Sequence, residues 1–399
     1  MLENRDIGRL LRLKVPWKVI DVRMSGDLKR VDIELGVEHD RMVGCPSCGT
    51  MCSVHDRVRR TWRHLDIMDA ECYITADIPR TRCEKCGILR IKTSWADEFV
   101  SYTNMFEKKT LGLLRSMPIS RAAMEMRIGY GVVEGMMDRF VHKALDMMDL
   151  SSVRNIMLDE TSSKRGHRYI TIITDADTGR IIFMCKGKGA DSIGEFRKWL
   201  VEHNGDPRNV RMVSCDLSRS FLSGLDKHFK RMRIVYDRFH LVQMANTALD
   251  EVRSKNQVNG QRDKKLRFTL LRNSGRLSED DRKRVFDVKN DNVVLGKAYE
   301  MKESLLQLYD YPDRMSATEH LRQWLKWVFA EGTDRMKRLG NTVAKHFSKI
   351  LNWFRSRMSN GFLEGLNGMI QSTKRIGRGY PNTDNFIRII YFRHGRLDV

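Results

Sequence analysis

The sequence is short of cysteine, of proline and of long hydrophobic runs, and each shortage excludes a class of protein. Eight cysteines in 399 residues are too few for a disulfide-held scaffold. No apolar run approaches the roughly 18 residues that a membrane-spanning helix needs, and the N-terminus has no signal-peptide layout. With 7 prolines, no internal repeat and no long Pro, Gly or Ser tract, we expect the modules of the chain to pack directly on one another.

Acidic residues are also in deficit, because 51 Asp and Glu face 72 Lys and Arg, which gives a net charge of +21 and a pI near 9.7. A composition of 41% hydrophobic and 31% charged residues indicates a globular chain, long enough for about two to four domains. The excess positive charge suits a long polyanion, since each phosphate that a basic side chain neutralises releases counterions. Nucleic acid is the polyanion that we expect, and a membrane surface is the alternative.

Four of the eight cysteines occur in two pairs. Residues 45–48 and 83–86 are each Cys-x-x-Cys followed by glycine, and two such turns bring four thiolates to tetrahedral zinc distance. The 34 residues between the pairs exceed the usual spacing, and a β-hairpin in this interval would account for the length. We expect a structural Zn²⁺ with four ligands, which are Cys45, Cys48, Cys83 and Cys86.

Three further candidates, Cys52, His55 and Cys72, are better explained as a small apolar filler and surface polar groups than as a second metal site. The expected hairpin also carries basic residues, and we assign nucleic-acid contacts to its arginines. These arginines are Arg57, Arg59, Arg60 and Arg63, and the hairpin also carries His64.

The next segment changes to helical periodicity. One helix is expected over 105–117, a second over 120–127 with Ser120 as its N-cap, and a third over 132–145 after a Gly-Tyr-Gly turn. This layout fits a helix-turn-helix that reads DNA, with Arg121 as a contact, and it fits a helical hairpin packed on the core equally well. The basic composition favours the DNA-binding interpretation.

Residues 153–240 read as three strands, a helix, a strand, a helix and a strand. Three antiparallel strands followed by α-β-α-β is the order of the ribonuclease-H-like fold, in which the first and fourth strands are neighbours. The first strand ends near Asp159 and the fourth near Asp216. We therefore expect an α/β catalytic core in which these two carboxylates lie together.

A third acid is expected from a helix near the end of the sequence. Apolar residues fall on one side of the helix that begins near Asn360, and Glu364 falls on another side together with Asn367 and Gln371. Glu364 can therefore face the two aspartates while the apolar side packs on the sheet. Oxygen ligands of this kind suit a pair of Mg²⁺ or Mn²⁺ ions, which would stabilise the attacking and leaving oxygens of a phosphoryl transfer. We expect three residues to be both metal ligands and catalytic residues, namely Asp159, Asp216 and Glu364.

Other acids in the same region have competing explanations. Asp175 and Asp177 are interpreted as turn residues, and Glu160 either supports the metal ligands or lies in solvent. Asp237 is the chief rival to the second aspartate of the site, but it could instead form a salt bridge. His240 is better explained as a hydrogen-bonded histidine than as a metal ligand.

Several motifs, taken in order, resemble those of a known family. They are residues 158–160 (Leu-Asp-Glu), 215–216 (Cys-Asp), 236–242 (Tyr-Asp-Arg-Phe-His-Leu-Val) with 248–253, and 360–367 (Asn-Gly-Phe-Leu-Glu-Gly-Leu-Asn) with 374–380. With the paired cysteines, this set resembles bacterial insertion-sequence transposases of the DDE class, in the ISL-three (ISL3) family, over nearly the whole length. The resemblance implies that Asp159, Asp216 and Glu364 are the catalytic triad.

Pattern and resemblance together predict four regions. These are an N-terminal β and zinc-binding domain (1–100), a helix-turn-helix (101–150), a ribonuclease-H-like core (151–249 and 356–399) and a helical insertion (250–355).

The resemblance also implies a DNA transposase that uses Mg²⁺ or Mn²⁺ for catalysis and Zn²⁺ for structure. It would bind terminal inverted repeats through the zinc module and the helix-turn-helix, and it would free a 3′-OH at each end with metal-activated water. That hydroxyl would then attack a phosphodiester of target DNA. The sequence has no P-loop motif, which fits, because transesterification conserves bond energy. We expect a homodimer on double-stranded DNA, no membrane partner and a cytoplasmic, nucleoid-associated location. Two alternatives stay open: a DNA-binding regulator whose core is catalytically inactive, and a structure-selective nuclease.

Basic residues also cluster late in the chain. We assign phosphate contacts to five of them, although a charged run is more often a solvated helix face. Trp324 and Trp327 are better explained by helix packing than by stacking on a displaced base. The five basic residues are Lys264, Lys265, Lys374, Arg375 and Arg378.

Overall fold

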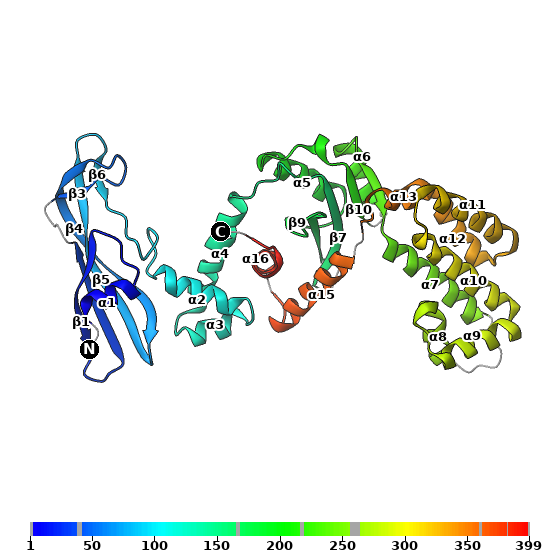
Figure 1. Cartoon of the computed structure of the whole chain (residues 1–399), viewed down its shortest axis with the longest axis horizontal. Coiled ribbons are helices and arrows are strands. Elements are labelled where there is room, and N and C mark those ends of the chain that lie inside the picture. Colours follow the sequence, from blue (N-terminus) through cyan, green and yellow to red (C-terminus); the bar gives the residue numbers. More distant parts are fainter. Residues whose placement is uncertain are drawn as a thin grey trace. The chain divides into compact units, whose positions relative to one another are not determined.

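The computed structural model describes residues 3–37, 42–164, 168–215, 219–255, 264–358, 361–380 and 382–397. The chain forms two compact units, Met1–Arg139 and Phe140–Val399, and Figure 1 shows their elements. Helices and strands are both abundant, so the predicted mixed α/β class is confirmed.

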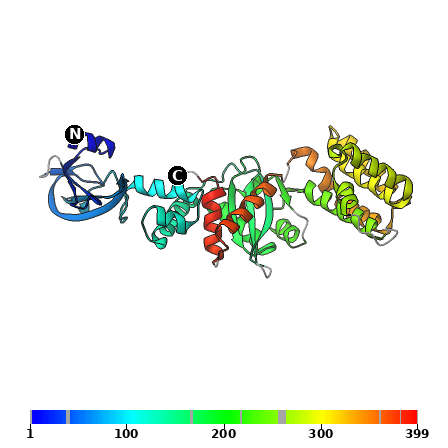
Figure 2. The ribbon, with the colours of Figure 1, turned by 90° about the horizontal axis from the view of Figure 1, so that it is seen from below.

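The first unit contains a sheet whose described strands follow the order β1-β2-β5-β4-β3, with β6 paired to β5. β1 and β2 form the antiparallel hairpin expected near the N-terminus, and β4 and β5 form the hairpin expected between the cysteine pairs. Figure 2 shows the long β4 strand curving around this unit. In the core, Trp95 meets Trp17 and Trp62 edge to face, at centroid distances of 4.8 and 5.4 Å. The elements are α1 (Asn4–Leu10), β1 (Trp17–Met24), β2 (Arg30–Val37), β3 (Met42–Gly44), β4 (Met51–Ile67), β5 (Ala70–Cys83) and β6 (Gly87–Arg90).

Helices follow this sheet close to the positions expected for a helix-turn-helix. Thr103 caps the first of them by accepting a hydrogen bond from the Phe106 N–H at 3.3 Å. The expected cap at Ser120 is wrong, because the second helix begins at Ile119, and Pro118 occupies the cap position without a side-chain hydrogen bond. The elements are α2 (Asn104–Leu114), α3 (Ile119–Glu125) and α4 (Tyr130–Asp146).

The second unit contains a sheet whose described strands follow the order β11-β10-β7-β8-β9. β7, β8 and β9 pair with one another in antiparallel fashion. β10 runs parallel to β7, and β11 runs parallel to β10. This chain order of strands and helices is the predicted one. The elements are β7 (Asn155–Lys164), β8 (Arg168–Asp175), β9 (Ile181–Lys186), α5 (Ala190–Glu202), η1 (Pro207–Asn209), β10 (Met212–Cys215), α6 (Arg219–His228), β11 (Arg233–Tyr236), α15 (Gly361–Ile376) and α16 (Thr383–His394).

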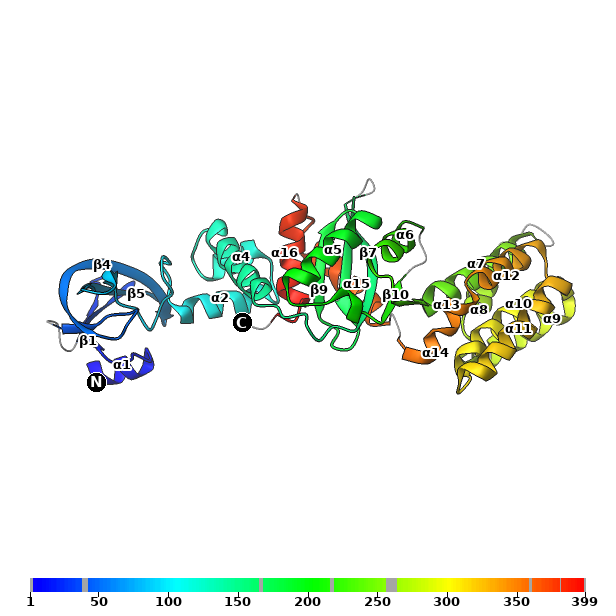
Figure 3. The same ribbon diagram turned by 90° about the horizontal axis from the view of Figure 1, so that it is seen from above.

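Different helices cover the two faces of this sheet. On β7, Ile156 and Leu158 point into a core shared with α5 and α6. Side chains alternate along a strand, so Asp159 and Thr161 point to the opposite face. That face is covered by α15 and α16, which Figures 1 and 3 show across the sheet from α5. The apolar side of α15 is buried there, as predicted, through Leu363, Leu366 and Ile370.

Between β11 and α15 the described chain is helical and has its own core. The Asn352 side-chain amide donates to the Ile234 carbonyl at 2.8 Å, which attaches the end of this segment to β11. The elements are α7 (Arg238–Lys255), α8 (Lys264–Leu271), η2 (Ser274–Arg276), α9 (Glu279–Asp291), α10 (Val293–Gln307), η3 (Leu308–Asp310), α11 (Arg314–Glu331), α12 (Asp334–Lys345), α13 (Phe347–Leu351) and α14 (Trp353–Ser356).

Trp324 belongs to this helical core and cannot stack on a base. Its side chain is 2% exposed, and its indole N–H donates to the Met301 carbonyl at 2.7 Å. Trp324→Phe should lower the free energy of unfolding by about 1–3 kcal/mol, through lost volume and a lost buried hydrogen bond. Urea denaturation measures this, and the half-buried Trp327 serves as the control, with a smaller expected loss for Trp327→Phe. Unchanged stability together with weaker DNA binding in Trp324→Phe would contradict the packing role.

Candidate functional site

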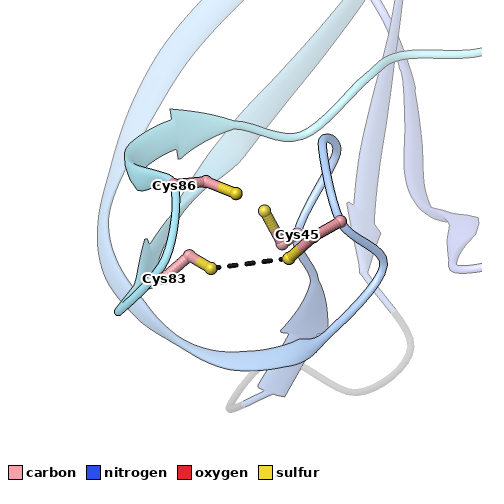
Figure 4. Close-up of side chains that lie close together, drawn as sticks. Cys45, Cys83 and Cys86 are labelled. Atoms are coloured by element: carbon pink, nitrogen blue, oxygen red, sulfur yellow. Dashed lines mark hydrogen bonds between the residues drawn. The ribbon is translucent and has the colours of Figure 1, made fainter.

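Four cysteines converge in the first unit. One thiolate ligand atom from each of Cys45, Cys48, Cys83 and Cys86 lies within 4.8 Å of the others, and the sulfurs of Cys48 and Cys83 are 3.6 Å apart. Figure 4 shows Cys45, Cys83 and Cys86 directing their sulfurs toward a common centre. Both turns need the positive φ that glycine allows: φ is 75° at the residue after Cys48 and 78° at the residue after Cys86.

The chemistry of this cluster fits Zn²⁺. Four sulfur ligands in a closed set are the arrangement of a structural zinc site, and hydrogen bonds with Thr50 lower the pKa of the Cys48 thiol to about 6, which favours the thiolate that zinc binds. Cys52 lies beside the cluster but is not part of it, and burial raises its pKa to about 11. Cys72 is fully buried in the sheet, and His55 is exposed and in contact with Arg82. Neither contributes to a metal site in the described residues.

The candidate catalytic site lies on the side of β7 that faces α15. The Asn367 amide donates to Asp159 Oδ2 at 2.7 Å. One turn further along the helix, the Gln371 amide donates to Thr161 Oγ1 at 3.0 Å, and the Lys374 ammonium then donates to the Ser162 carbonyl at 3.2 Å. This row of contacts fixes α15 along the strand.

Glu364 lies one turn before Asn367 on α15, so it extends from the same side of the helix. Asp237 follows directly after β11, is 3% exposed, and accepts hydrogen bonds from the Phe239 N–H at 3.0 Å and from His240 Nδ1 at 2.7 Å. The structure therefore brings Asp159, Asp237, His240 and Glu364 close enough for their charges to act on one another.

Two of these carboxyl groups are perturbed. Burial raises the pKa of Asp159, while the Glu160 N–H, His240 and Asn367 oppose that rise. Burial also raises the pKa of Glu364, and the negative charges of Asp237 and Asp159 add to the rise. Acids that repel one another in this way favour a site for a cation.

The predicted ligand Asp216 lies outside the described residues, which stop at Cys215 and resume at residue 219. Asp175 accepts a hydrogen bond from the Thr178 hydroxyl at 2.6 Å, which agrees with a turn residue. His240 is a hydrogen-bonded histidine, as expected, and Asp237 is a described partner of its Nδ1 atom.

The basic residues assigned to DNA differ in exposure. Arg63 is 6% exposed and forms ion pairs with Asp66 at 2.6 Å and Glu71 at 3.6 Å, so it stabilises the sheet. Arg60 is half-buried and donates to the Val100 carbonyl at 2.9 Å. The side chain of Lys264 lies outside the described residues, Lys374 is partly buried, and the exposed members are Arg57, Arg59, Arg121, Lys265, Arg375 and Arg378.

Among the residues that the structure describes, no helix combines the length and the apolar character needed to cross a bilayer.

Comparison with known proteins gives matches over most of the chain. A sequence model of the ISL3 family, described as "Transposase", matches residues 156–390, and one described as "zinc-finger of transposase IS204/IS1001/IS1096/IS1165" matches residues 41–86. The chain is similar to the transposase for insertion sequence element IS1001 of Bordetella parapertussis, with 24% identity over 354 residues and 86% of each chain covered. It is also similar to the transposase for insertion sequence element IS1557 of two Mycobacterium tuberculosis strains, with 24% identity over 405 positions, covering 92% of this chain and 88% of the relative.

Proposed function

This chain belongs to the ISL3 family of insertion-sequence transposases, and on that basis we propose that it cuts DNA at the ends of an insertion sequence and joins the freed ends to target DNA. One contact carries the proposal: the hydrogen bond from Asn367 to Asp159 joins residues 208 positions apart. This bond sets α15, and with it Glu364, against the strand that carries Asp159.

We assign catalysis to Asp159, Asp216 and Glu364, with Asp237 as a further acid of the same site. The order β11-β10-β7-β8-β9, whose first three strands in the chain are antiparallel, supports a ribonuclease-H-like core. In such a core the acids come from strands and from a helix laid on the sheet. Here Asp159 lies within β7, which continues to Lys164 instead of ending near Asp159 as expected, Asp237 follows β11, and Glu364 lies on α15.

The grouped carboxylates fit a hard divalent cation, because their oxygens are the ligands such ions prefer and because burial and mutual repulsion raise the pKa of Asp159 and of Glu364. Asp159, Glu364 and Asp216 would hold Mg²⁺ or Mn²⁺, which when bound supplies Lewis-acid stabilisation of the attacking and leaving oxygens. Asn367 holds the Asp159 carboxylate in place, and His240 does the same for Asp237.

The reaction consists of two displacements at phosphorus. A water oxygen first bonds to the phosphorus at the end of the element, and the bond from that phosphorus to the 3′ oxygen breaks, which leaves a 3′-OH. This 3′ oxygen then bonds to a phosphorus of target DNA, and the target's own bond to its 3′ oxygen breaks. The second step forms one phosphodiester for each one lost, so no nucleotide cofactor is required.

The first unit is proposed to recognise the ends. Helices α2 to α4 form the proposed helix-turn-helix, and the zinc module presents exposed arginines on β4. We propose the four regions expected from the sequence: an N-terminal β and zinc-binding domain (1–100), a helix-turn-helix (101–150), a ribonuclease-H-like core (151–249 and 356–399) and a helical insertion (250–355). Because the two ends must be held together during the reaction, a homodimer is the proposed active assembly.

Asn367→Ala should lower the rate of end cleavage by about 10- to 100-fold, the usual cost of removing a group that orients a metal-binding carboxylate. Gln371→Ala is the matched control: it lies one turn away on the same helix, contacts Thr161 rather than an acid, and should change the rate by less than about threefold. An equal loss of cleavage rate in the two variants would mean that Asn367 acts only by holding α15 against β7.

The proposed function is tested with labelled duplexes that carry the inverted repeats flanking the gene for this chain, called end duplexes below. With Mg²⁺ and target DNA, a transposase produces joined strands. Cleavage without joining indicates the structure-selective nuclease, and a gel shift without cleavage indicates the regulator. Either of those outcomes would overturn the proposal.

A further inference from the structure

A groove begins at His240 and runs between α7 and α12 in the second unit. It encloses about 380 Å³, which is within the range of pockets that hold one small ligand. His240 lines the groove and is also the partner of Asp237. The groove therefore opens directly beside the grouped acids of the candidate catalytic site.

The groove has a basic rim. Arg338 is exposed and, among the described residues, forms no ion pair. Arg335 pairs with Glu251 at 2.6 Å, but its Nε–H is buried without a hydrogen-bond partner in the described structure. The rim thus carries one positive charge more than it neutralises, which suits a phosphate.

The floor of the groove is apolar and aromatic. Tyr236 is buried there beside Met244, its hydroxyl 3.5 Å from the Met244 sulfur, and Leu339 lies on the opposite helix. An apolar floor matches the face of a base only when that base is unstacked, since in a duplex both faces are covered by neighbouring bases. A whole duplex is also too large for this volume.

We propose that the groove between α7 and α12 holds one unpaired nucleotide next to the phosphodiester that is cut, with Arg338 and Arg335 contacting its phosphate. This inference rests on the proposed function and specifies the form of its DNA substrate. It assigns the helical segment a part in the reaction: the segment draws one base out of the duplex and so fixes the position of the neighbouring phosphate beside Asp159 and Glu364.

The test uses the full-length, zinc-containing protein and end duplexes with 2-aminopurine at each of the positions that flank the cut, without added Mg²⁺. Unstacking of the base in the groove should raise its fluorescence by about threefold or more at one position. Arg338→Ala, which removes the phosphate contact, and Thr247→Trp, which fills the groove from its exposed rim, should each abolish most of that rise. With Mg²⁺ both should slow cleavage by about tenfold or more.

Lys345→Ala is the matched control, because Lys345 is an exposed cation on the same helix outside the groove lining. It should behave as the unmodified protein, and thermal melting of all three variants reports whether they fold. If folded Arg338→Ala and Thr247→Trp give the unmodified fluorescence and cleavage, the groove inference is overturned while the proposed function stands. If the unmodified protein neither binds nor cuts end duplexes, both are overturned.

Discussion

Glu364→Gln should abolish end cleavage and strand joining while end-duplex binding stays unchanged. Glutamine keeps the size of the side chain but removes the negative charge that stands among Asp159, Asp237 and His240. The expected loss is at least about a thousandfold in rate, equivalent to about 4 kcal/mol of activation free energy. A single-turnover cleavage assay with Mg²⁺ measures it, and a gel shift on the same end duplex measures binding.

The matched control for this variant is Glu202→Gln. Glu202 is an exposed acid at the end of α5, on the other face of the same sheet, and its loss removes the same charge without touching the grouped acids. Its cleavage rate should match that of the unmodified protein. Cleavage by Glu364→Gln at a rate within tenfold of the control would remove Glu364 from the catalytic set.

Cys83→Ser should unfold the zinc-binding end of the first unit. Cys83 ends β5 and pairs with Gly87 of β6, so the metal would hold this turn to the turn that carries Cys45 and Cys48. The apolar cluster at this place consists of cysteines and Leu89 alone. Structural zinc sites contribute about 10–16 kcal/mol of apparent binding free energy, which is as large as the whole stability of a typical domain, about 5–15 kcal/mol. Loss of one ligand therefore outweighs what the local packing supplies.

Three measurements follow for this variant. Bound zinc should fall from one ion per chain to none, amide exchange in β3 and β6 should become fast, and end-duplex binding should weaken by at least about tenfold. Cys52→Ala is the control, since Cys52 is a buried neighbour outside the set of four and its variant should keep its zinc. A Cys83→Ser protein that retains one zinc ion and slow exchange would contradict the structural role of the metal.

Local patterns were sufficient to predict several elements. Alternation of apolar and polar residues identified the β1–β2 hairpin and the chain order from β7 to β11, because each such strand is read from its own residues. The cysteine pairs identified their own cluster, since each Cys-x-x-Cys turn already sets two sulfurs close together. The helical phase of α15 placed Glu364 and Asn367 on one side before any partner was known.

The burial of a side chain and its contacts with distant residues could not be predicted from local patterns. The basic run around Arg63 predicts a DNA contact, and only the packing of β4 against β5 reveals that Arg63 is buried and paired with Asp66 and Glu71. Likewise, no local pattern relates Asn367 to Asp159 or α12 to α7, since such contacts depend on how separate elements meet. The groove beside His240 could therefore not be anticipated from the residues that line it.

The row of contacts along α15 also restricts where the length of the chain can change. Glu364 and Asn367 share a side of the helix only while their separation stays at three residues, since each residue of an α-helix turns it by about 100°. One residue inserted between them would rotate Glu364 away from Asp159 and Asp237, while Asn367 and Gln371 kept their contacts with β7. Length variation among natural homologues should accordingly be absent from this short interval and accumulate in the turns between the helices of the segment that follows β11.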